Sequence, residues 1–233
     1  MSNGRWQLRY LLSLVCVVML LVTSTASATN GFLLFGYGAR SVGMGGGGAA
    51  LPQDGLVVVN NPAGLVEVAD GLDLGLMLFN PRIHSTVGAN SWSSSEKFFP
   101  MPDFSFTRHI TPDLAWGVAL YGSGGFGSRF KDNLFTGDPN DDVAIHILNT
   151  VIAPTLSWRF HPKHSIGFTP LLTYQQLSLR GLNAFQCFTP TAQAGGGCPG
   201  LPNTPSTQLT NNGFDESFGF GFRLGWLGQV LPR

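Results

Sequence analysis

Large apolar side chains alternate with small or polar ones along several stretches of the chain, and this period of two constrains the fold most. In residues 217–226 the apolar side chains share one phase, while glycine, serine and arginine share the other. Residues 72–78, 103–107 and 115–121 alternate in the same way. Successive side chains of a β-strand point to opposite faces. The pattern therefore predicts strands with one apolar face and one small or polar face.

Two longer runs are less regular. The apolar residues of 143–160 and of 165–180 change phase part-way, with Pro154 and Pro170 inside the runs. Proline within a sheet favours an edge or a bulge, and a bulge moves later side chains to the opposite face. Each run is therefore predicted to be one long strand with an irregularity near its proline.

The connections between the predicted strands alternate between long and short. The segments around 84–97, 123–142 and 181–213 are long, whereas 110–113 and 161–164 are short. Transmembrane β-barrels have this arrangement, with short periplasmic turns and long extracellular loops. Four aromatic residues lie at strand ends on the predicted periplasmic side, where a belt would meet lipid headgroups. They are Trp116, Trp158, Phe160 and Trp226.

The charge of the chain agrees with a wall that faces lipid. Charged residues make up only 11% of the sequence against 43% hydrophobic residues, and Lys plus Arg balance Asp plus Glu at 13 each. A soluble fold normally carries more charge on its outer surface, although a soluble all-β domain remains the alternative. Without a basic excess, nucleic acid is not expected as a partner.

The N-terminus has the order of an export signal. Arg5 and Arg9 precede an apolar run, which ends in the small residues Ala26-Ser27-Ala28. A positive segment, a short apolar core and an A-x-A site define a secretory signal peptide. Residues 1–28 are therefore predicted to be removed. In an exported chain, Cys187 and Cys198 are candidate disulfide partners, or two unpaired thiols.

A glycine-rich stretch follows, from residue 29 to residue 70. It contains the run Gly45–Gly48, fits neither a regular helix nor a strand, and closes in Asn61-Pro62-Ala63. Ordered glycine costs backbone entropy. The stretch is therefore predicted to be a flexible plug that another part of the protein holds in place.

These features together resemble the FadL-type outer-membrane channels for long-chain fatty acids and aromatic hydrocarbons. The matching segments are GFLLFGYGARSVGMGGGGAA, NNPAGL at 60–65 and GFRLGW at 221–226. The resemblance implies a barrel of fourteen antiparallel strands with an N-terminal hatch in its lumen. Hydrophobic solutes would be captured among the extracellular loops, pass the hatch by passive diffusion and leave sideways at a kinked strand.

By this resemblance, residues 29–70 would be the hatch, with Asn61, Pro62 and Ala63 as its motif. Residues 71–233 would be a partial barrel. About six strands are predicted, so the expected fold is all-β and an open half-barrel, a fragment or truncated member of the family. Six strands are fewer than the smallest membrane barrels have.

The apolar residues of the long loops are the candidate ligand groove, or they only pack the loops together. They are Phe126, Phe130, Leu134, Phe135, Phe185, Phe188 and Leu201. Arg129 and Lys131 are candidates to meet a carboxylate, or ordinary solvated charges. Arg223 is expected to face the lumen.

Signals for catalysis are weak. Gly43-x-Gly45-x-x-Gly48 matches a dinucleotide spacing, but no strand precedes it and no acidic residue follows at the required distance. No metal set or cofactor is expected, and the chain is predicted not to be an enzyme. An outer-membrane lipid hydrolase is the rival enzyme class. A non-transporting exported barrel, such as an adhesin or structural protein, and a non-functional fragment also stay open at the level of sequence.

Overall fold

A computed structural model of the chain describes residues 33–188 and 210–229, without the side chains of residues 186 and 187. These residues belong to one structural unit, Phe32–Arg233. The predicted signal peptide, Leu201 and Cys198 lie outside the described residues, as does the side chain of Cys187.

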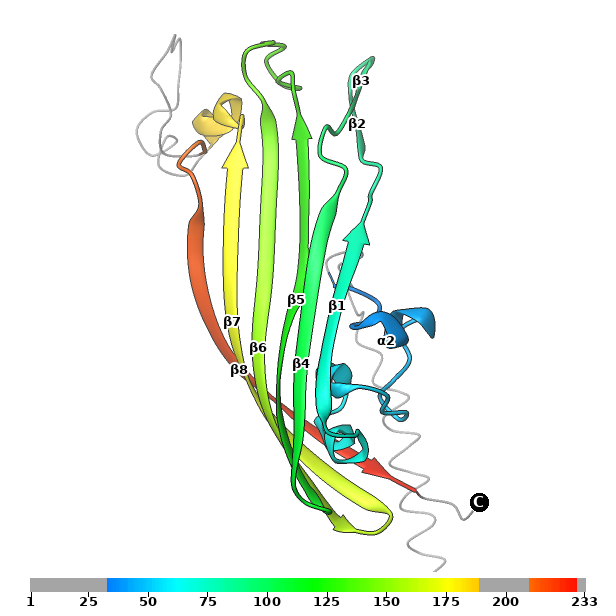
Figure 1. Ribbon diagram of the computed structural model, residues 1–233. Coiled ribbons are helices and arrows are strands. Elements are labelled where there is room, and N and C mark those ends of the chain that lie inside the picture. Colours follow the sequence, from blue (N-terminus) through cyan, green and yellow to red (C-terminus); the bar gives the residue numbers. More distant parts are fainter. Residues whose placement is uncertain (1–32, 189–209, 230–233) are drawn as a thin grey trace, which may run out of the picture. The chain divides into compact units, whose positions relative to one another are not determined.

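Six strands form one antiparallel sheet in the order β1-β4-β5-β6-β7-β8 (Figure 1). The strands are β1 (Gly71–Phe79), β4 (Phe99–Thr111), β5 (Leu114–Phe130), β6 (Val143–His161), β7 (His164–Arg180) and β8 (Asp215–Gly228). Each strand pairs with the next along the sheet, and β1 and β8 are not paired with each other. The sheet is therefore an open partial barrel, as predicted.

The connections alternate as predicted. Short turns join β4 to β5 and β6 to β7, at the lower end of the strands in Figure 1. The first long connection contains a hairpin that the sequence pattern did not predict, formed by β2 (His84–Val87) and β3 (Asn90–Ser93). The third contains a short 3₁₀ helix, η3 (Asn183–Phe188).

The two faces of the sheet differ. Large apolar side chains point away from the hatch side and remain exposed, up to 83% for Phe218. The predicted aromatic belt lies on this face near the short turns, where Trp158, Ile166 and Trp226 form one cross-strand row. A wall with an apolar outer face is what a bilayer requires.

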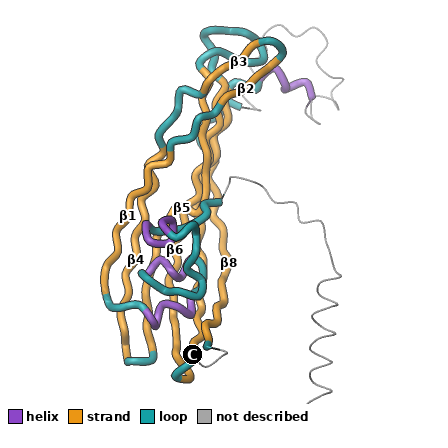
Figure 2. Tube along the Cα trace, turned by 90° about the vertical axis from the view of Figure 1, so that its right-hand side faces the viewer, coloured by secondary structure: helices purple, strands orange, loops and turns teal. Residues whose placement is uncertain are grey.

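The hatch, described here as residues 33–70, lies against the other face over its lower half (Figure 2). The expectation that it contains no helix is wrong for three short stretches, α2 (Ala39–Gly43), η1 (Gly55–Val59) and η2 (Pro62–Glu67). Asp54 and Asn61 cap η1 and η2 with their side chains, as their residue types favour. The buried core lies between these helices and the wall.

The irregularity predicted near Pro154 and Pro170 is present as a break in pairing and not as a bulge. The β6–β7 ladder stops at Ile152–Leu172 and resumes at Leu156–Phe168 in the same register, and the β7–β8 ladder continues through Pro170 without a shift. The sequence changes phase because the inward face changes composition. Beside the hatch it carries small residues such as Ser157, Ser165 and Gly167. Above the hatch it carries Val143, Ile145, Ile147, Leu177 and Leu179. A wall that the hatch does not cover has room for larger apolar side chains.

Candidate functional site

The wall has a gap between β4 and β5. The two strands pair from Thr111 and Leu114 only as far as Asp103 and Tyr121. Beyond that pair, β4 continues along β1 and β5 continues along β6. Higher up, Ser95 N donates to Arg129 O at 2.8 Å and joins the two sides again. We call the opening between these points, edged by residues 99–102 and 122–128, the wall gap.

An irregularity in β5 lies at the lower end of the wall gap. The register between β5 and β6 shifts between Gly122 and Gly124. Before the shift Tyr121 is opposite Val151, and after it Phe126 is opposite Ile147. An extra residue bends a strand and ends regular pairing on its free edge. The signal for it is the cluster of glycines at 122–125, which the sequence pattern predicts to be part of a loop.

A cavity of about 320 Å³ opens at the wall gap. Aromatic and aliphatic side chains from four strands dominate its lining. They include Phe79, Phe99, Met101, Phe126, Ile147 and Leu148. His146 and Thr150 also line it, and no Lys, Arg, Asp or Glu is among its lining residues. A cavity of this size and chemistry suits an uncharged hydrophobic solute.

The beginning of the hatch touches the edge of the wall gap. Leu33 forms an antiparallel bridge with Gly124. The Tyr37 hydroxyl donates to the backbone oxygen of Ser123 at 2.7 Å, and its ring packs edge-on against Tyr121 with 5.1 Å between centroids. Unpaired backbone groups inside a membrane cost several kcal/mol each. These contacts therefore stabilise the free edge of β5 while the hatch is in place.

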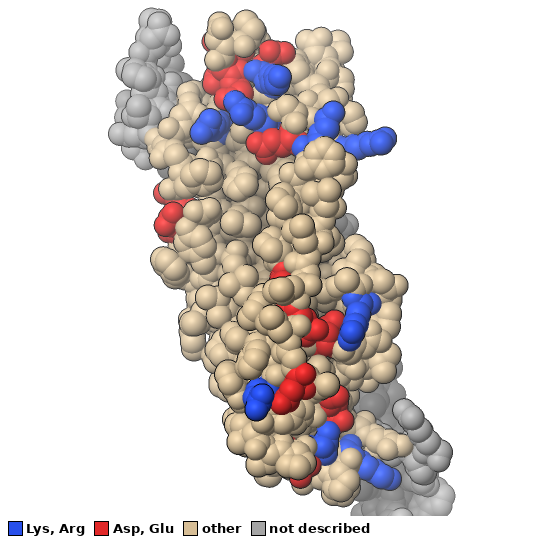
Figure 3. All heavy atoms as spheres, viewed as in Figure 1, with Lys and Arg blue, Asp and Glu red and all other residues tan. Residues whose placement is uncertain are grey.

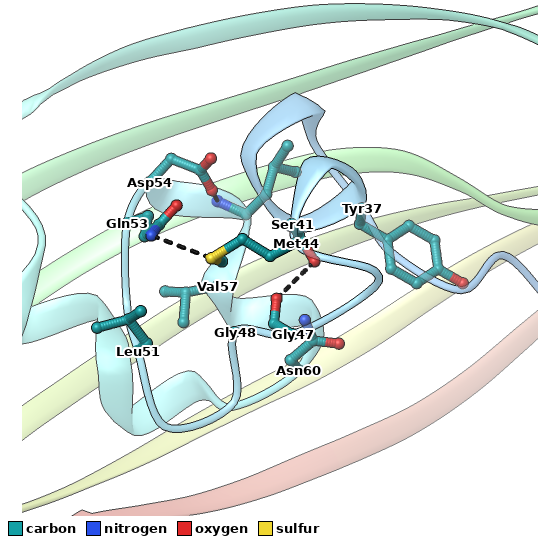
Figure 4. A pocket seen from close by; sticks show the side chains of 11 residues that line it. Tyr37, Ser41, Met44, Gly47, Gly48, Leu51, Gln53, Asp54, Val57 and Asn60 are labelled. Carbon is teal, nitrogen blue, oxygen red and sulfur yellow. Dashed lines mark hydrogen bonds between the residues drawn. The ribbon is translucent and has the colours of Figure 1, made fainter.

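The glycine-rich part of the hatch is ordered by local contacts (Figure 4). The Ser41 hydroxyl donates to Gly47 O at 2.9 Å, and the Gln53 amide donates to the sulfur of Met44 at 3.3 Å. The pocket that this loop lines has a volume of only about 10 Å³, about the room for one water molecule. The space at this loop is therefore too small for a solute much larger than water.

The hatch motif anchors the other end. Asn61 Nδ2 donates to Trp226 O at 3.0 Å and to Ala49 O at 2.9 Å, and its Oδ1 accepts from Ala63 N at 3.1 Å. The hydroxyls of Ser157 and Ser165 both donate to Ala63 O. The predicted motif is therefore a docking point on β6, β7 and β8.

Two glycines of the wall make this docking possible. A methyl group on Gly225 would collide with Asn61 Oδ1, and one on Gly167 would collide with the backbone of Pro62. Arg223 faces the same side, as expected, and its guanidinium donates to Val58 O at 3.1 Å. Small residues at these positions let the backbones approach closely.

Carboxylates meet at the start of η1. Asp73 Oδ2 accepts from Gly55 N and from the Ser105 hydroxyl, both at 3.0 Å. Asp54 Oδ1 accepts from Leu56 N at 3.1 Å. Burial, and after it the negative charge of Asp73, raise the pKa of Asp54 above its usual value. The carboxylates of Asp54 and Asp73 thus accept the hydrogen bonds that hold this edge of the hatch, although their negative charges repel each other.

The candidate groove residues do not form one group. Phe126 and Phe130 lie on β5 and not in a loop, and Phe126 lines the wall gap cavity. Phe130 and Leu134 are buried. Phe135 packs edge-on against Phe185 at 4.7 Å between centroids, and Phe188 adjoins Phe185. Only this last set forms an exposed aromatic cluster among the long connections.

Sequence reasoning missed Asn133, which organises the connection between β5 and β6. Its side-chain amide donates to Asp141 and to Gly181 O, while its Oδ1 accepts from the backbone N–H groups of Phe135 and Thr136. An asparagine that binds the backbone two residues ahead is a common turn signal. Its position in Lys131–Phe135 could have indicated an ordered connection.

Comparison with known proteins identifies the family of the chain. The family model described as Outer membrane protein transport protein (OMPP1/FadL/TodX) matches residues 19–230. The chain belongs to this family. Its members are outer-membrane transport proteins of the FadL and TodX type, as the sequence resemblance predicted.

Solved structures agree on the fold. The toluene transporter TodX of P. putida is similar with a TM-score of 0.63 and 20% identity, over 85% of this chain and 53% of TodX. The toluene transporter TbuX of Ralstonia pickettii gives a TM-score of 0.62 and 22% identity, over 85% of this chain and 55% of TbuX. The chain therefore spans about half the length of these relatives.

A curated sequence relative covers a smaller part. An uncharacterized protein from the phosphoenolpyruvate carboxykinase gene 5′ region of Chlorobium limicola is 44% identical over 74 residues, which is 30% of this chain and 36% of that protein. No helix among residues 33–188 and 210–229 has the length and hydrophobicity needed to cross a membrane. Within the same residues, no three His, Cys, Asp or Glu side chains group as metal ligands would.

Proposed function

We propose that the chain takes part in the uptake of hydrophobic compounds, long-chain fatty acids or aromatic hydrocarbons, across a Gram-negative outer membrane. The observation that carries this proposal is the apolar cavity at the wall gap, beside the first residues of the hatch. Movement is by passive diffusion down a gradient and involves no bond chemistry. The similarity to two toluene transporters supports this function.

Capture and descent use the apolar surfaces above the hatch. A solute first meets the aromatic cluster of Phe135, Phe185 and Phe188, and then the inward aliphatic side chains of β6 and β7. Each CH₂ group removed from water is worth about 0.8 kcal/mol. The path therefore becomes favourable for a hydrophobic solute before the solute reaches the hatch.

Exit is sideways through the wall gap, with the hatch as the gate. Leu33 and Tyr37 hold the hatch to the gap edge, whereas the Asn61 motif holds it to the opposite part of the wall. Release of the first contacts frees the edge of β5 without undocking η2. The solute then leaves into the lipid at the level of the cavity.

The domain arrangement of the proposal follows from this path. Residues 1–28 are the export signal, 29–70 the hatch and 71–233 part of the membrane wall. Among the described strands, β1 and β8 each have one edge without a neighbour. Such edges cost several kcal/mol per unpaired group in lipid, so a working channel closes its wall with further strands.

Uptake measurements with a blocked gap test the proposal. A strain that expresses the gene is compared with the empty strain for accumulation of labelled toluene and labelled oleate. Gly122 lines the cavity, and a Cβ atom added there would meet no atom within 4 Å. Gly122→Phe is therefore expected to place its ring at the cavity without a clash at Cβ.

We expect Gly122→Phe to reduce uptake to near the level of the empty strain. Gly71→Phe is the matched control, because Gly71 also has open space around it and is not among the cavity-lining residues. Equal uptake by Gly122→Phe and the unmodified protein would exclude the sideways path. No uptake by the unmodified protein above the empty strain would refute the transport function itself.

A further inference from the structure

Two arginines lie in one row across the outer face of the sheet, near the long connections. Arg129 of β5 is opposite Ala144 of β6, and Ala144 is opposite Arg180 of β7. Directly opposed residues of a sheet point to the same side. With neighbouring strands about 4.8 Å apart, the two Cα atoms are separated by about 10 Å. The small alanine between them places no bulky side chain between the two guanidinium groups.

This row faces the lipid side. On β6 the even-numbered residues Leu148, Ile152 and Leu156 are the exposed apolar ones, and Ala144 shares their phase. Arg129 and Arg180 are therefore on the same face as the apolar belt, above it. Figure 3 shows Lys and Arg side chains gathered together with Asp and Glu near this end of the strands.

The height of the row matches the lipid headgroups. From Trp158, in the lower aromatic belt, to Ala144 the strand rises about 35 Å, at roughly 3.3 Å per residue and a tilt of about 40°. The apolar band of an outer-membrane barrel is about 25 Å tall. The arginines therefore stand above the hydrocarbon, where the phosphates of the outer leaflet lie.

A hollow of about 150 Å³ is formed at this row. Arg129, Arg180 and His146 line it together with Glu96, Ser178 and Phe214. His146 packs edge-on against Phe214, with 5.7 Å between centroids. Polar donors above and an aromatic side chain beside them suit an amphipathic molecule with an anionic head.

The charges around the hollow are mixed. The Nε of Arg129 pairs with Asp142, which orients the guanidinium. No described side chain forms an ion pair with Arg180. Guanidinium groups bind phosphate through paired N–H donors. The negative charge of Glu96 repels a phosphate, so removal of this charge strengthens phosphate binding.

We propose that Arg129 and Arg180 bind the phosphorylated headgroup of an outer-leaflet lipid, as found in lipopolysaccharide. The apolar side chains of β6 and β7 below the row then contact its acyl chains. The inference rests on the proposed location in an outer membrane and is independent of transport through the wall gap. The bound lipid then covers the outer face of the wall between the wall gap and the long connections.

Lipid retention tests the proposal. The full chain is purified in mild detergent from outer membranes, and lipopolysaccharide is measured per protein molecule by mass spectrometry and phosphorus content. The double variant Arg129→Gln/Arg180→Gln is expected to retain at least tenfold less lipid. Arg108→Gln is the matched control, an exposed arginine at the opposite end of the sheet, and is expected to retain as much as the unmodified protein. Glu96→Gln is expected to retain more.

A second arm distinguishes lipid from free phosphate. Delipidated protein is titrated with bisphosphorylated lipid A, with dephosphorylated lipid A and with inorganic phosphate. Preference for the bisphosphorylated lipid over both others supports the site. Equal binding of both lipids, equal competition by inorganic phosphate, or equal retention by the double variant overturns it. Retention is measured without any transport step, so a failure of uptake would leave this result standing.

Discussion

A single methyl group on Gly225 should loosen the hatch. The Cβ of an alanine there would lie against Asn61 Oδ1, within 2.7 Å of Pro62 Cδ and 3.0 Å of Ala63 N. The last two belong to a proline ring and to the backbone, so they cannot rotate away. Gly221 lies on the same strand and the same face, but a methyl there would have its nearest neighbour, in Leu171, at 3.9 Å. Gly221→Ala is therefore a close control.

The magnitude follows from the difference between the two variants. Alanine stabilises a strand interior by about 0.5–1 kcal/mol relative to glycine, and this gain is common to both. Overpacking at Gly225 costs about 1–3 kcal/mol, and Gly221 has no such cost. Gly225→Ala should therefore shift the equilibrium toward the undocked hatch by a factor of about 5 to 150 relative to Gly221→Ala.

Hydrogen exchange of the amides of residues 63–66 measures this shift. In the docked state Val66 N donates to the Ser157 hydroxyl at 3.3 Å, and Ala63 N donates to Asn61. The detergent-solubilised variants are compared under conditions in which exchange reports local opening. If both variants exchange at the same rate as the unmodified protein, the close contact does not hold the hatch.

Three further substitutions test other contacts of the hatch. Tyr37→Phe keeps the ring contact with Tyr121 but removes the hydrogen bond to Ser123 O. Loss of that hydrogen bond costs about 0.5–1.5 kcal/mol, so hydrogen exchange of the amides near residues 33–38 should become about 2- to 12-fold faster. An unchanged exchange rate would show that this hydrogen bond does not hold the hatch to the edge of the wall gap. The pKa of Asp54 is higher in the folded protein than in the unfolded chain, so the ionised carboxylate destabilises the folded protein at pH values above the folded-state pKa. This destabilisation disappears as the pH falls to the pKa of the unfolded chain. Asp54→Asn should therefore stabilise η1 at pH 7 and flatten its dependence on pH between 4 and 8 in thermal unfolding, whereas an unchanged pH profile would contradict the argument. Hydrogen bonds from the His109 side chain and backbone lower the pKa of Asp70 in the folded protein. The ionised Asp70 therefore stabilises the folded protein at pH values above the pKa of the unfolded chain, and this stabilisation is lost as the pH falls through the folded-state pKa. In Asp70→Asn that loss at low pH should be absent from the unfolding curve.

The alternation of side chains is enough to predict the strands and the faces of β1 and β8. It works because a lipid-facing side and a hatch-facing side impose unlike residues at every second position. The same reasoning fails in β6 and β7. Above the hatch their inward positions are also apolar, so Ile147 and Leu177 suggest a change of face when only the lining has changed.

The candidate site is only partly predictable. Asn61-Pro62-Ala63 is identified by its place between the glycines and the first strand, but its partners Ser157, Ser165 and Gly225 depend on pairing across the sheet. The wall gap exists because β4 and β5 stop pairing part-way along their length, and the local sequence of either strand does not show where pairing ends. Glycines at 122–125 fit a bulge as well as a loop, and only the register of β5 against β6 distinguishes the two.

The division of the inner wall into a fitted lower part and an open upper part has a consequence for protein engineering. Lower positions such as Gly167 and Ser157 are set by contact with the hatch, so larger residues there would disturb its docking. Upper positions such as Val143 and Leu179 do not carry that constraint. On the proposed transport path, selectivity for a new pollutant or fuel molecule can therefore be redesigned in the upper half of the wall, while the docking surface of the hatch in the lower half is left unaltered.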